Sequence, residues 1–295
     1  MLVDLTKITS GFSEKLRVIT FFVAVVVLKK KKKNLGIIDK KTTECPYFFS
    51  DYLKIKGFSS YKSKLNQNDN LIKINTYNSF PNLKNCILHN QFNLNNDRLL
   101  KKWKSSYKLL TPKSVIRKKI KLLKLPKSYL SIHIRSTDRT VNLKYFLKKI
   151  DHKDIILNLQ LNFFQKNIVR TINKYSNIKN IFISSDDRIL KKKLINILIK
   201  NNFNVYYNRI LYKKKFRQTS AKDFITDLFC LAKSRLIIST TGGGVTYTAS
   251  LINKKIKIIK FINEINIFYI LRIFFLSIYY LKRIKSKLIN LNKTN

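Results

Sequence analysis

The sequence predicts an α/β fold with a mostly parallel sheet, and three observations lead to this prediction. Short apolar segments alternate with longer, helix-length segments over residues 129–252. A run of three glycines at 242–244 separates one strand segment from the helix segment after it. No Pro follows Pro126. Strands that alternate with helices form parallel sheets joined by right-handed crossovers.

The N-terminal part, up to about residue 110, shows few signals. A helix is expected after Gly11, because residues 18–28 (VITFFVAVVVL) are almost all apolar, and a strand is expected over 35–38. The alternative for 18–28 is a secretory or anchoring segment, but the stretch is too short to cross a bilayer and no small-residue cleavage site follows it. A buried helix that runs into the lysines at 29–33 is the preferred interpretation.

The remaining elements follow in order along the chain. Thr111 as N-cap and Pro112 at the first helical position predict the start of a helix. Residues 129–135 (YLSIHIR) alternate as a strand does, with aliphatic side chains on one face and Ser131 and His133 on the other. Further strands are expected over 181–184, 205–207 and 236–239, and further helices over 155–175, 188–201, 222–233 and 245–252.

The composition is that of a folded, strongly basic chain. It has 295 residues, with 61 Lys and Arg against 15 Asp and Glu, so 61 minus 15 gives the formal charge of +46. Hydrophobic residues make up 45%, which is enough to bury a core and excludes a disordered chain. An AT-rich coding sequence would by itself inflate Lys, although the field still attracts phosphates. Three distant cysteines without a CxxC pair favour a reducing, cytoplasmic compartment.

The candidate site lies where the strands end, because ligands of open α/β sheets bind outside the carboxyl ends of the strands. Polar residues follow three of the expected strands, at 133–139 (HIRSTDR), 184–187 (SSDD) and 239–244 (STTGGG). Glycines let backbone N–H groups approach an anion, and the helix after them adds the positive end of its dipole. The segment at 239–244 therefore predicts a phosphate cradle, with a plain tight turn as the alternative.

Two residues at the end of the first strand are candidates for ligand contacts. Arg135 is expected to hold a diphosphate, because a guanidinium binds two phosphate oxygens at once; a local ion pair with Asp138 is the alternative, and both can hold together. His133 would donate to a ribose or a base, or would be a structural residue. Neither a third His nor a Cys cluster completes a zinc-binding set with His133, so no metal is expected.

Three aspartates complete the set of candidates. Asp186 and Asp187 resemble a pair of ligands for a divalent ion, but capping of the helix that begins near Arg188 explains them more simply. Asp227 lies on the helix before the last expected strand. Its carboxylate would accept the paired N–H donors of a guanine edge, or would bond to a neighbouring Lys.

These segments, in this order, resemble the GDP-fucose-dependent fucosyltransferases, a superfamily that includes α-1,6-, nodulation and protein O-fucosyltransferases. HIRSTD at 133–138 is similar to the H-x-R-x-x-D region of that superfamily, IFISSDD at 181–187 to its second motif, and the stretch at 223–252 to its third. SGFSEKLRVITFFVAVVV and the later ECPYFFSDYL look like its N-terminal opening and Cys-Pro segment.

The resemblance implies a GT-B-like fold with two Rossmann-like domains and a mostly parallel sheet in the C-terminal, nucleotide-binding domain. Residues 1–110 would form the acceptor-side α/β domain, 111–262 the Rossmann-like GDP-sugar-binding domain, and 263–295 a basic, aromatic C-terminal helix. The implied activity is glycosyl transfer, as by a fucosyltransferase, from a GDP-sugar (GDP-fucose) to a hydroxyl of a glycan acceptor. The transfer would proceed with inversion and need neither a metal nor a cofactor.

The resemblance also assigns roles to individual positions. Arg135 would hold the diphosphate, with Asp138 beside it at the catalytic site. The substrate-binding positions would be His133, Asp186, Asp187, Asp227, Thr240, Thr241, Gly242 and Gly243. Serines usually stand where Gly242 and Gly243 are, so backbone amides would replace hydroxyl contacts here. Ser13-Glu14 replaces the usual Gly-Asn before the first helix, and Ser136 replaces a second Arg found in the α-1,6 branch.

Two other classes of function remain open. The charge and the many aromatic residues also suit a nucleic-acid-binding protein, but no nucleic-acid-binding signature is present, so a nucleic-acid partner is not expected. Residues 265–281 (INIFYILRIFFLSIYYL) lead into KRIKSK. They would form a helix at an anionic membrane surface, making the protein peripheral to the membrane, or a helix packed on the domain. A membrane-associated structural protein is the third possibility.

Overall fold

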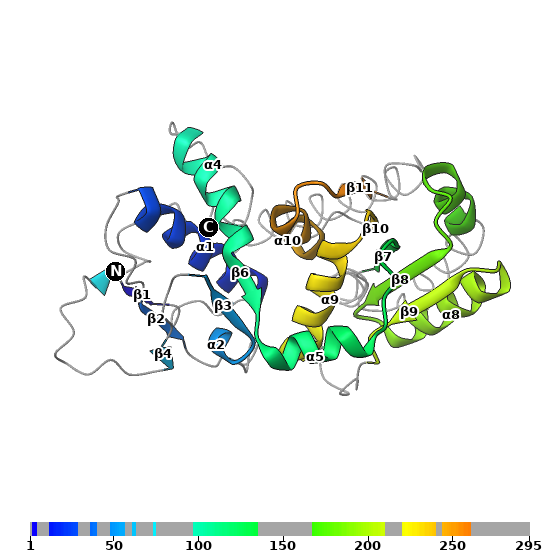
Figure 1. The fold of residues 1–295 in the computed structure, drawn as a ribbon, viewed down its shortest axis with the longest axis horizontal. Coiled ribbons are helices and arrows are strands. Elements are labelled where there is room, and N and C mark those ends of the chain that lie inside the picture. The colour runs from blue at the N-terminus through cyan, green and yellow to red at the C-terminus, as the bar shows by residue number, and fades with distance from the viewer. Residues whose placement is uncertain are drawn as a thin grey trace, which may run out of the picture.

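The computed structural model describes residues 2–4, 12–28, 36–39, 48–56, 61–62, 73–74, 97–134, 167–209, 220–239 and 244–260. In this part of the chain the structure is mixed α/β (Figure 1). It contains a four-stranded sheet in the order β4-β2-β1-β5, a five-stranded sheet in the order β11-β10-β7-β8-β9, and a two-stranded sheet of β3 and β6.

The N-terminal elements form the two smaller sheets and the helices beside them. The four-stranded sheet pairs in parallel throughout, and β3 and β6 pair antiparallel. The elements are β1 (Leu2–Asp4), α1 (Phe12–Leu28), β2 (Gly36–Asp39), α2 (Phe49–Tyr52), β3 (Leu53–Ile55), β4 (Tyr61–Lys62), β5 (Lys73–Ile74), α4 (Asp97–Ser106), η1 (Tyr107–Leu109) and β6 (Leu110–Pro112).

The C-terminal elements build the five-stranded sheet, in which every neighbouring pair is parallel. They are α5 (Ser114–Leu122), β7 (Leu130–Ile134), β8 (Asn180–Ser185), α8 (Arg188–Lys200), β9 (Asn204–Tyr207), α9 (Ala221–Lys233), β10 (Leu236–Ser239), α10 (Gly244–Ile252) and β11 (Lys257–Lys260), with a further helix over 167–175. The strand order reverses direction between β7 and β10, which makes that boundary the topological switch point, where open α/β sheets bind their ligands.

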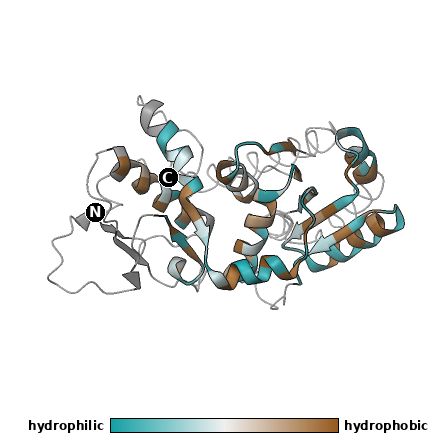
Figure 2. Ribbon diagram, viewed as in Figure 1, coloured by the Kyte–Doolittle hydropathy of each residue, from teal (hydrophilic) through white to brown (hydrophobic). Residues whose placement is uncertain are grey.

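Helices cover both faces of the five-stranded sheet, as Figure 1 shows with α9 and α10 on one side and α8 on the other. On β8, Ile181 and Ile183 join the cluster under α8, whereas Phe182 joins the cluster under α9. Because side chains alternate along a strand, both faces must be apolar in such a sheet. α5 and α8 carry both hydrophobic and hydrophilic residues along their length (Figure 2), as helices with one buried side do.

A second part of the core joins the N-terminal helices to the sheet. Apolar side chains of α1, including Phe21 and Phe22, belong to the same buried cluster as Trp103, Ile225 and Val245. α1 packs chiefly against α4 and also touches α10. The buried cluster therefore runs across the expected boundary at residue 110, and the division into domains stays a prediction.

The structure confirms most of the expected elements. The helix after Gly11 is α1, its residues 18–24 are buried, and the strand expected over 35–38 is β2. Every strand and helix expected between 181 and 252 is present within one or two residues of its expected bounds. The expected helix over 155–175 is seen over 167–175, and the rest of it lies outside the described residues, as does the C-terminal helix expected over 265–281.

Two expectations need correction. Thr111 and Pro112 do not start a helix: they lie in β6, where Pro112 pairs with Leu53, and α5 begins at Ser114. Among the described strands, β6 pairs with β3 alone, and such an edge position tolerates a Pro that lacks an N–H. Ser131 and His133 do lie on the face of β7 opposite the aliphatic residues, but they too are buried, because helices cover that face as well.

Among the described helices, none is both long and apolar enough to cross a membrane.

Candidate functional site

Three polar side chains lie side by side at the carboxyl edge of the five-stranded sheet. The register pairs His133 of β7 with Ser239 of β10 on one side and with Ser184 of β8 on the other. All three strands run in parallel, so their carboxyl ends meet at one edge. His133 and Ser239 lie on either side of the switch point between β7 and β10. The fold thus brings together the strand ends that the sequence singled out.

His133 is tied to the start of α10. Its Nδ1 lies 2.9 Å from the hydroxyl of Thr246, which lies 3.1 Å from the hydroxyl of Ser239. All three side chains are buried. These bonds fix the imidazole and connect the ends of β7 and β10 to the first turns of α10. The sequence suggested a ligand contact or a structural role for His133, and these bonds show that it has at least the structural one.

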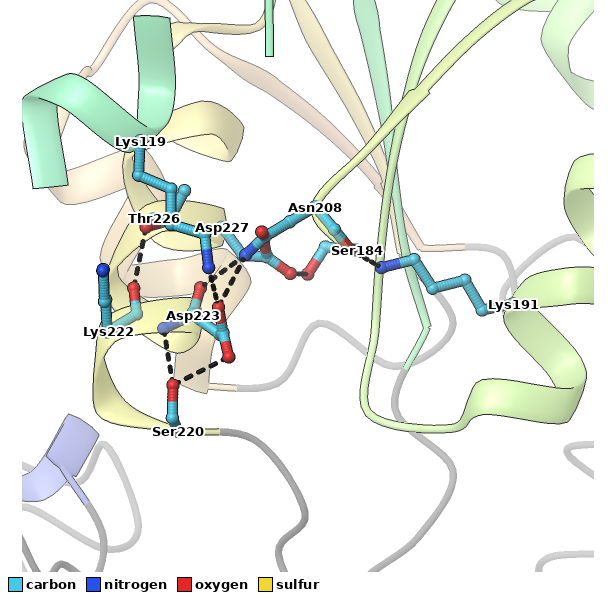
Figure 3. A network of polar contacts seen from close by, with 9 residues as sticks. All are labelled: Lys119, Ser184, Lys191, Asn208, Ser220, Lys222, Asp223, Thr226 and Asp227. Carbon is cyan, nitrogen blue, oxygen red and sulfur yellow. Dashed lines mark hydrogen bonds and ion pairs between the residues drawn. The ribbon is translucent and has the colours of Figure 1, made fainter. Parts of the chain in front are cut away.

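Asp227 lies in a buried polar network, which Figure 3 shows from close by. The Ser184 hydroxyl donates to one carboxylate oxygen at 2.8 Å, and the Asn208 amide donates to the other at 3.1 Å. Burial raises the pKa of the Asp227 carboxyl, and the nearby Lys191 together with these hydrogen bonds opposes that shift. Each carboxylate oxygen of Asp227 thus already accepts one hydrogen bond from the protein. A contact of Asp227 with guanine stays a prediction.

Lys191 is the buried cation of this network. Its ammonium donates to the backbone carbonyl of Asn208 at 2.9 Å and lies 5.6 Å from the centre of the Tyr207 ring. Burial lowers the pKa of Lys191, and the negative charges of Asp227 and Asp223 counteract that effect. Lys191 therefore holds the end of β9 against α8 from within the protein.

Asp223 joins α9 to α5. Ser220 is the N-cap of α9: its hydroxyl accepts from the Asp223 N–H at 3.1 Å and donates to the Asp223 carboxylate at 2.7 Å. The ammonium of Lys119 on α5 forms an ion pair with the same carboxylate (Figure 3). The Asn208 amide also donates to Asp223, at 3.3 Å, so Asn208 bridges the two aspartates of α9.

The two aspartates after β8 have different surroundings. Asp187 is the N-cap of α8, and its carboxylate accepts from the Leu190 N–H at 3.0 Å. Its own N–H donates to the Ser185 hydroxyl at 3.1 Å. Asp186 is partly exposed. The structure therefore supports the capping interpretation for Asp187, and a contact of either residue with nucleoside or sugar stays a prediction.

The remaining predicted residues follow the described strand ends directly. Arg135 and Asp138 come after Ile134, the last residue of β7, and the Thr-Gly segment lies between Ser239 and Gly244. These positions lie outside the described residues: Arg135, Asp138, Thr240, Thr241, Gly242 and Gly243. Within the part of the chain that is described, no group of three or more His, Cys, Asp or Glu could hold a metal ion.

Sequence reasoning missed four residues that shape this edge. Asn208 and Lys191 complete the network around Asp227, Thr246 holds His133, and Arg17 of α1 lies beside Gly244. Asn and Lys are so abundant in this chain that neither stands out in the sequence. Thr246 lies two residues beyond the glycine run, and only this proximity could have indicated it.

Comparison with solved structures identifies the class of fold. The fucosyltransferase NodZ from Bradyrhizobium aligns over 88% of this chain and 95% of that one, with 14% sequence identity and a TM-score of 0.52. NodZ alpha-1,6-fucosyltransferase co-crystallised with GDP aligns over 85% and 92%, with 13% identity and a TM-score of 0.50. The chain thus has a GDP-fucose fucosyltransferase-like fold of the GT-B type, as the motifs indicated.

Other similarities are weaker. POFUT1 in complex with GDP-fucose aligns over 54% of this chain, which spans about half (49%) of that chain, with 15% identity and a TM-score of 0.37. No protein-family model matches the chain, and no curated protein matches its sequence significantly.

Proposed function

We propose that this chain is a glycosyltransferase that binds a GDP-sugar, GDP-fucose, at the carboxyl edge of the five-stranded sheet and transfers the sugar to a hydroxyl of a glycan. One observation carries the proposal. In a fucosyltransferase-like fold, His133, Ser184 and Ser239 lie in one register row at the switch point, and the H-x-R-x-x-D and Gly-rich segments continue from these strand ends. Open α/β sheets bind nucleotides at this place.

The proposed reaction is one displacement with inversion. The acceptor oxygen bonds to the anomeric carbon as the bond from that carbon to the phosphate oxygen breaks. The electron pair of the broken bond leaves with GDP, and the acceptor proton goes to a base, for which Glu14 and Asp138 are the candidates. Arg135 and the backbone at Gly242 and Gly243 stabilise the negative charge that develops on the leaving diphosphate. This charge stabilisation by protein groups supports a metal-independent transfer.

The buried polar network around Asp227 and Asp223 holds the elements that carry this proposed site. Asp227 bonds Ser184 at the end of β8 and Asn208 after β9, while Asp223 bonds Asn208 and pairs with Lys119 on α5. Three elements are thus held to α9 by buried or partly buried polar contacts. Binding sites on such rigidly held strand ends keep their geometry when a ligand arrives.

Ligand-induced stabilisation tests the proposal. GDP should raise the unfolding temperature selectively over UDP and CMP, because a ligand that binds only the folded state stabilises it by mass action. At a GDP concentration of 100 Kd the gain is about 2.7 kcal/mol. Equal shifts with all three nucleotides would contradict guanine specificity.

A transfer assay tests the chemistry. Incubation with GDP-fucose and a panel of oligosaccharides should release GDP and form a product whose anomeric configuration is opposite to that of the donor. The rate should be the same with and without EDTA. Retained configuration or loss of activity with EDTA would contradict the inverting, metal-independent mechanism.

We also propose a cytoplasmic location at an anionic membrane surface. The flanking cluster KRIKSK after the aromatic stretch at 265–281 supports it. Flotation with anionic vesicles, with and without the residues beyond 263, tests it: binding should require both the residues and the anionic lipid.

A further inference from the structure

Helix α5 is held on the protein from one side. Ile116 and Ile120 on that side are buried, and the helix packs against α9. From the same side, Lys119 forms an ion pair with Asp223 of α9. The other side of α5 is exposed, and Figure 1 shows the helix at the lower edge of the molecule. A partner can therefore reach α5 without displacing it from the core.

The exposed side of α5 carries positive charge that no neighbouring acid balances. Exposed cations lie on the helix and just after it: Arg117, Lys118, Lys121, Lys124 and Lys127. None of them forms an ion pair with another described residue. The sequence has no Asp or Glu over 98–137. Like charges close together on a helix repel one another, so this face favours an anionic partner.

Two exposed apolar side chains share this face. Leu122 is 79% exposed and Val115 is 37% exposed. Lys118 lies three residues after Val115 and four before Leu122, so the three side chains form one row along the helix. A partner that offers charge alone would leave the leucine in water, whereas a lipid surface would bury it. Cations beside exposed aliphatic side chains are typical of helices that lie on anionic membranes.

The chemistry of the chain disfavours other occupants of this face. A second copy of the chain, with a formal charge of +46, would bring positive charge to positive charge, and so would its own KRIKSK segment at 282–287. A nucleic acid would satisfy the cations, but α5 has no aromatic side chain on which a base could stack. An anionic lipid surface satisfies both the charge and the exposed aliphatic groups.

We propose that the exposed face of α5 docks on an anionic membrane surface. Leu122 and Val115 enter the boundary between headgroups and acyl chains, and the cations beside them contact the lipid headgroups. The inference goes beyond the proposed glycosyl transfer. It adds a second contact, on a described helix, to the membrane contact proposed for the residues beyond 263. Two contacts on one chain bind more tightly than either alone, because the second forms within an existing complex.

Binding of the full chain to vesicles tests the charged part of this surface. The vesicles contain equimolar phosphatidylserine and phosphatidylcholine, or phosphatidylcholine alone. Lys118→Gln/Lys121→Gln should bind the anionic vesicles about thirtyfold more weakly than the wild type, because each Lys near such a surface contributes a factor of about five.

Lys254→Gln/Lys255→Gln is the matched control for charge. It removes two exposed lysines from the turn between α10 and β11, at the opposite edge of the view in Figure 1. It should bind the anionic vesicles much as the wild type does. Equal weakening by the two double variants would overturn the proposal, because it would reveal a general attraction by the net charge.

Leu122→Gln tests the apolar part without altering the charge. It should weaken binding to the anionic vesicles about tenfold, because the apolar side chain that enters the lipid is lost. Leu122→Met keeps an apolar side chain of similar size and should bind as the wild type does. Since residue 122 is exposed, neither substitution should change the unfolding temperature. Unchanged vesicle binding by Leu122→Gln would overturn the proposal.

A single-stranded oligonucleotide and GDP complete the experiment. If Lys118→Gln/Lys121→Gln lost oligonucleotide affinity but kept its vesicle affinity, α5 would be a nucleic-acid surface and the proposal would be wrong. A wild-type protein that did not bind anionic vesicles would overturn it as well. GDP affinity should be the same in the wild type and all these variants. Vesicle binding as expected, without any binding of GDP, would refute the proposed transferase and support the α5 surface.

Discussion

Asp227 carries a buried carboxylate that is held by hydrogen bonds to two other parts of the fold. Its carboxylate is buried among Ser184, Asn208 and Lys191, and burial raises its pKa. A buried carboxylate is tolerated when hydrogen bonds and an opposite charge compensate for lost hydration. Removing a single hydrogen-bond partner of Asp227 should therefore lower the free energy of unfolding, so substitutions of these partners test the network.

Ser184→Ala should lower the free energy of unfolding by about 2 kcal/mol, because the buried carboxylate of Asp227 loses one hydrogen bond to a charged group. Denaturant unfolding measures the change. Ser105→Ala is the control: its hydroxyl donates to the Lys102 carbonyl within α4 and the residue is not fully buried, so the cost should stay below about 0.5 kcal/mol. Equal effects of the two substitutions would show that the hydrogen bond from Ser184 to Asp227 does not stabilise the fold more than an ordinary surface hydroxyl does.

The raised pKa of Asp227 predicts a pH dependence. Between the unfolded pKa of about 4 and the raised folded pKa, the folded state binds more protons, so stability falls as pH rises through this window. Asp227→Asn lacks this titration. The stability of Asp227→Asn relative to the wild type should therefore increase from pH 4 upward, as measured by unfolding at several pH values. A difference that is constant with pH, or that decreases, would show that the pKa is not raised.

Arg135→Lys tests the arginine of the H-x-R-x-x-D motif, which is proposed to bind the diphosphate. A point charge cannot replace the two-pronged guanidinium, so kcat should fall by about 10²- to 10³-fold. A steady-state transfer assay with GDP-fucose measures it. Turnover at the wild-type rate would remove Arg135 from the mechanism.

At the scale of single residues, the sequence could predict contacts that depend on near neighbours. Asp187 as a helix cap is such a case, since the cap and the N–H group that it binds are three residues apart. Asn208 and Arg17 could not be predicted, because their partners are 15 to 19 residues away or on another part of the fold. Nothing in their local pattern distinguishes them from other Asn and Arg residues.

At the scale of elements, Asp187 is the N-cap of α8, and substitutions there can distinguish helix capping from ligand binding. Asp187→Ala should lower the free energy of unfolding by about 1 kcal/mol, and Asp187→Ser should restore most of it, because Ser caps helices about as well as Asp. If capping is the whole role, GDP affinity should be unchanged in Asp187→Ser. A stable Asp187→Ser variant with weaker GDP binding would instead show that the carboxylate contacts the ligand.

Elements were predicted best where burial enforces periodicity. The strands and helices between 181 and 252 alternate because each strand must be apolar on both faces and each helix on one. The strands β1, β4 and β5 were missed, since two or three residues carry no periodicity. Thr111 and Pro112 have the residue types of a helix start, but pairing with β3 takes them into a strand instead.

At the scale of the whole molecule, the order of the strands could not be obtained from the sequence. Alternation predicts a parallel sheet, but the order β11-β10-β7-β8-β9 depends on which way each crossover turns. That order matters, because it puts β10 next to β7, so the two strand ends from which the Gly-rich and H-x-R-x-x-D segments continue lie side by side. The packing of α1 against α10 is equally a property of the folded whole.

Hydrogen exchange with and without saturating GDP locates the nucleotide on the folded chain most directly. The proposed function predicts slower exchange in peptides that cover the ends of β7, β8 and β10, that is, residues 130–139, 181–187 and 236–247. Peptides from the outer part of α8 should exchange at the same rate in both states. No change anywhere, or protection confined to regions away from these three strand ends, would contradict a GDP-sugar site at this edge of the sheet.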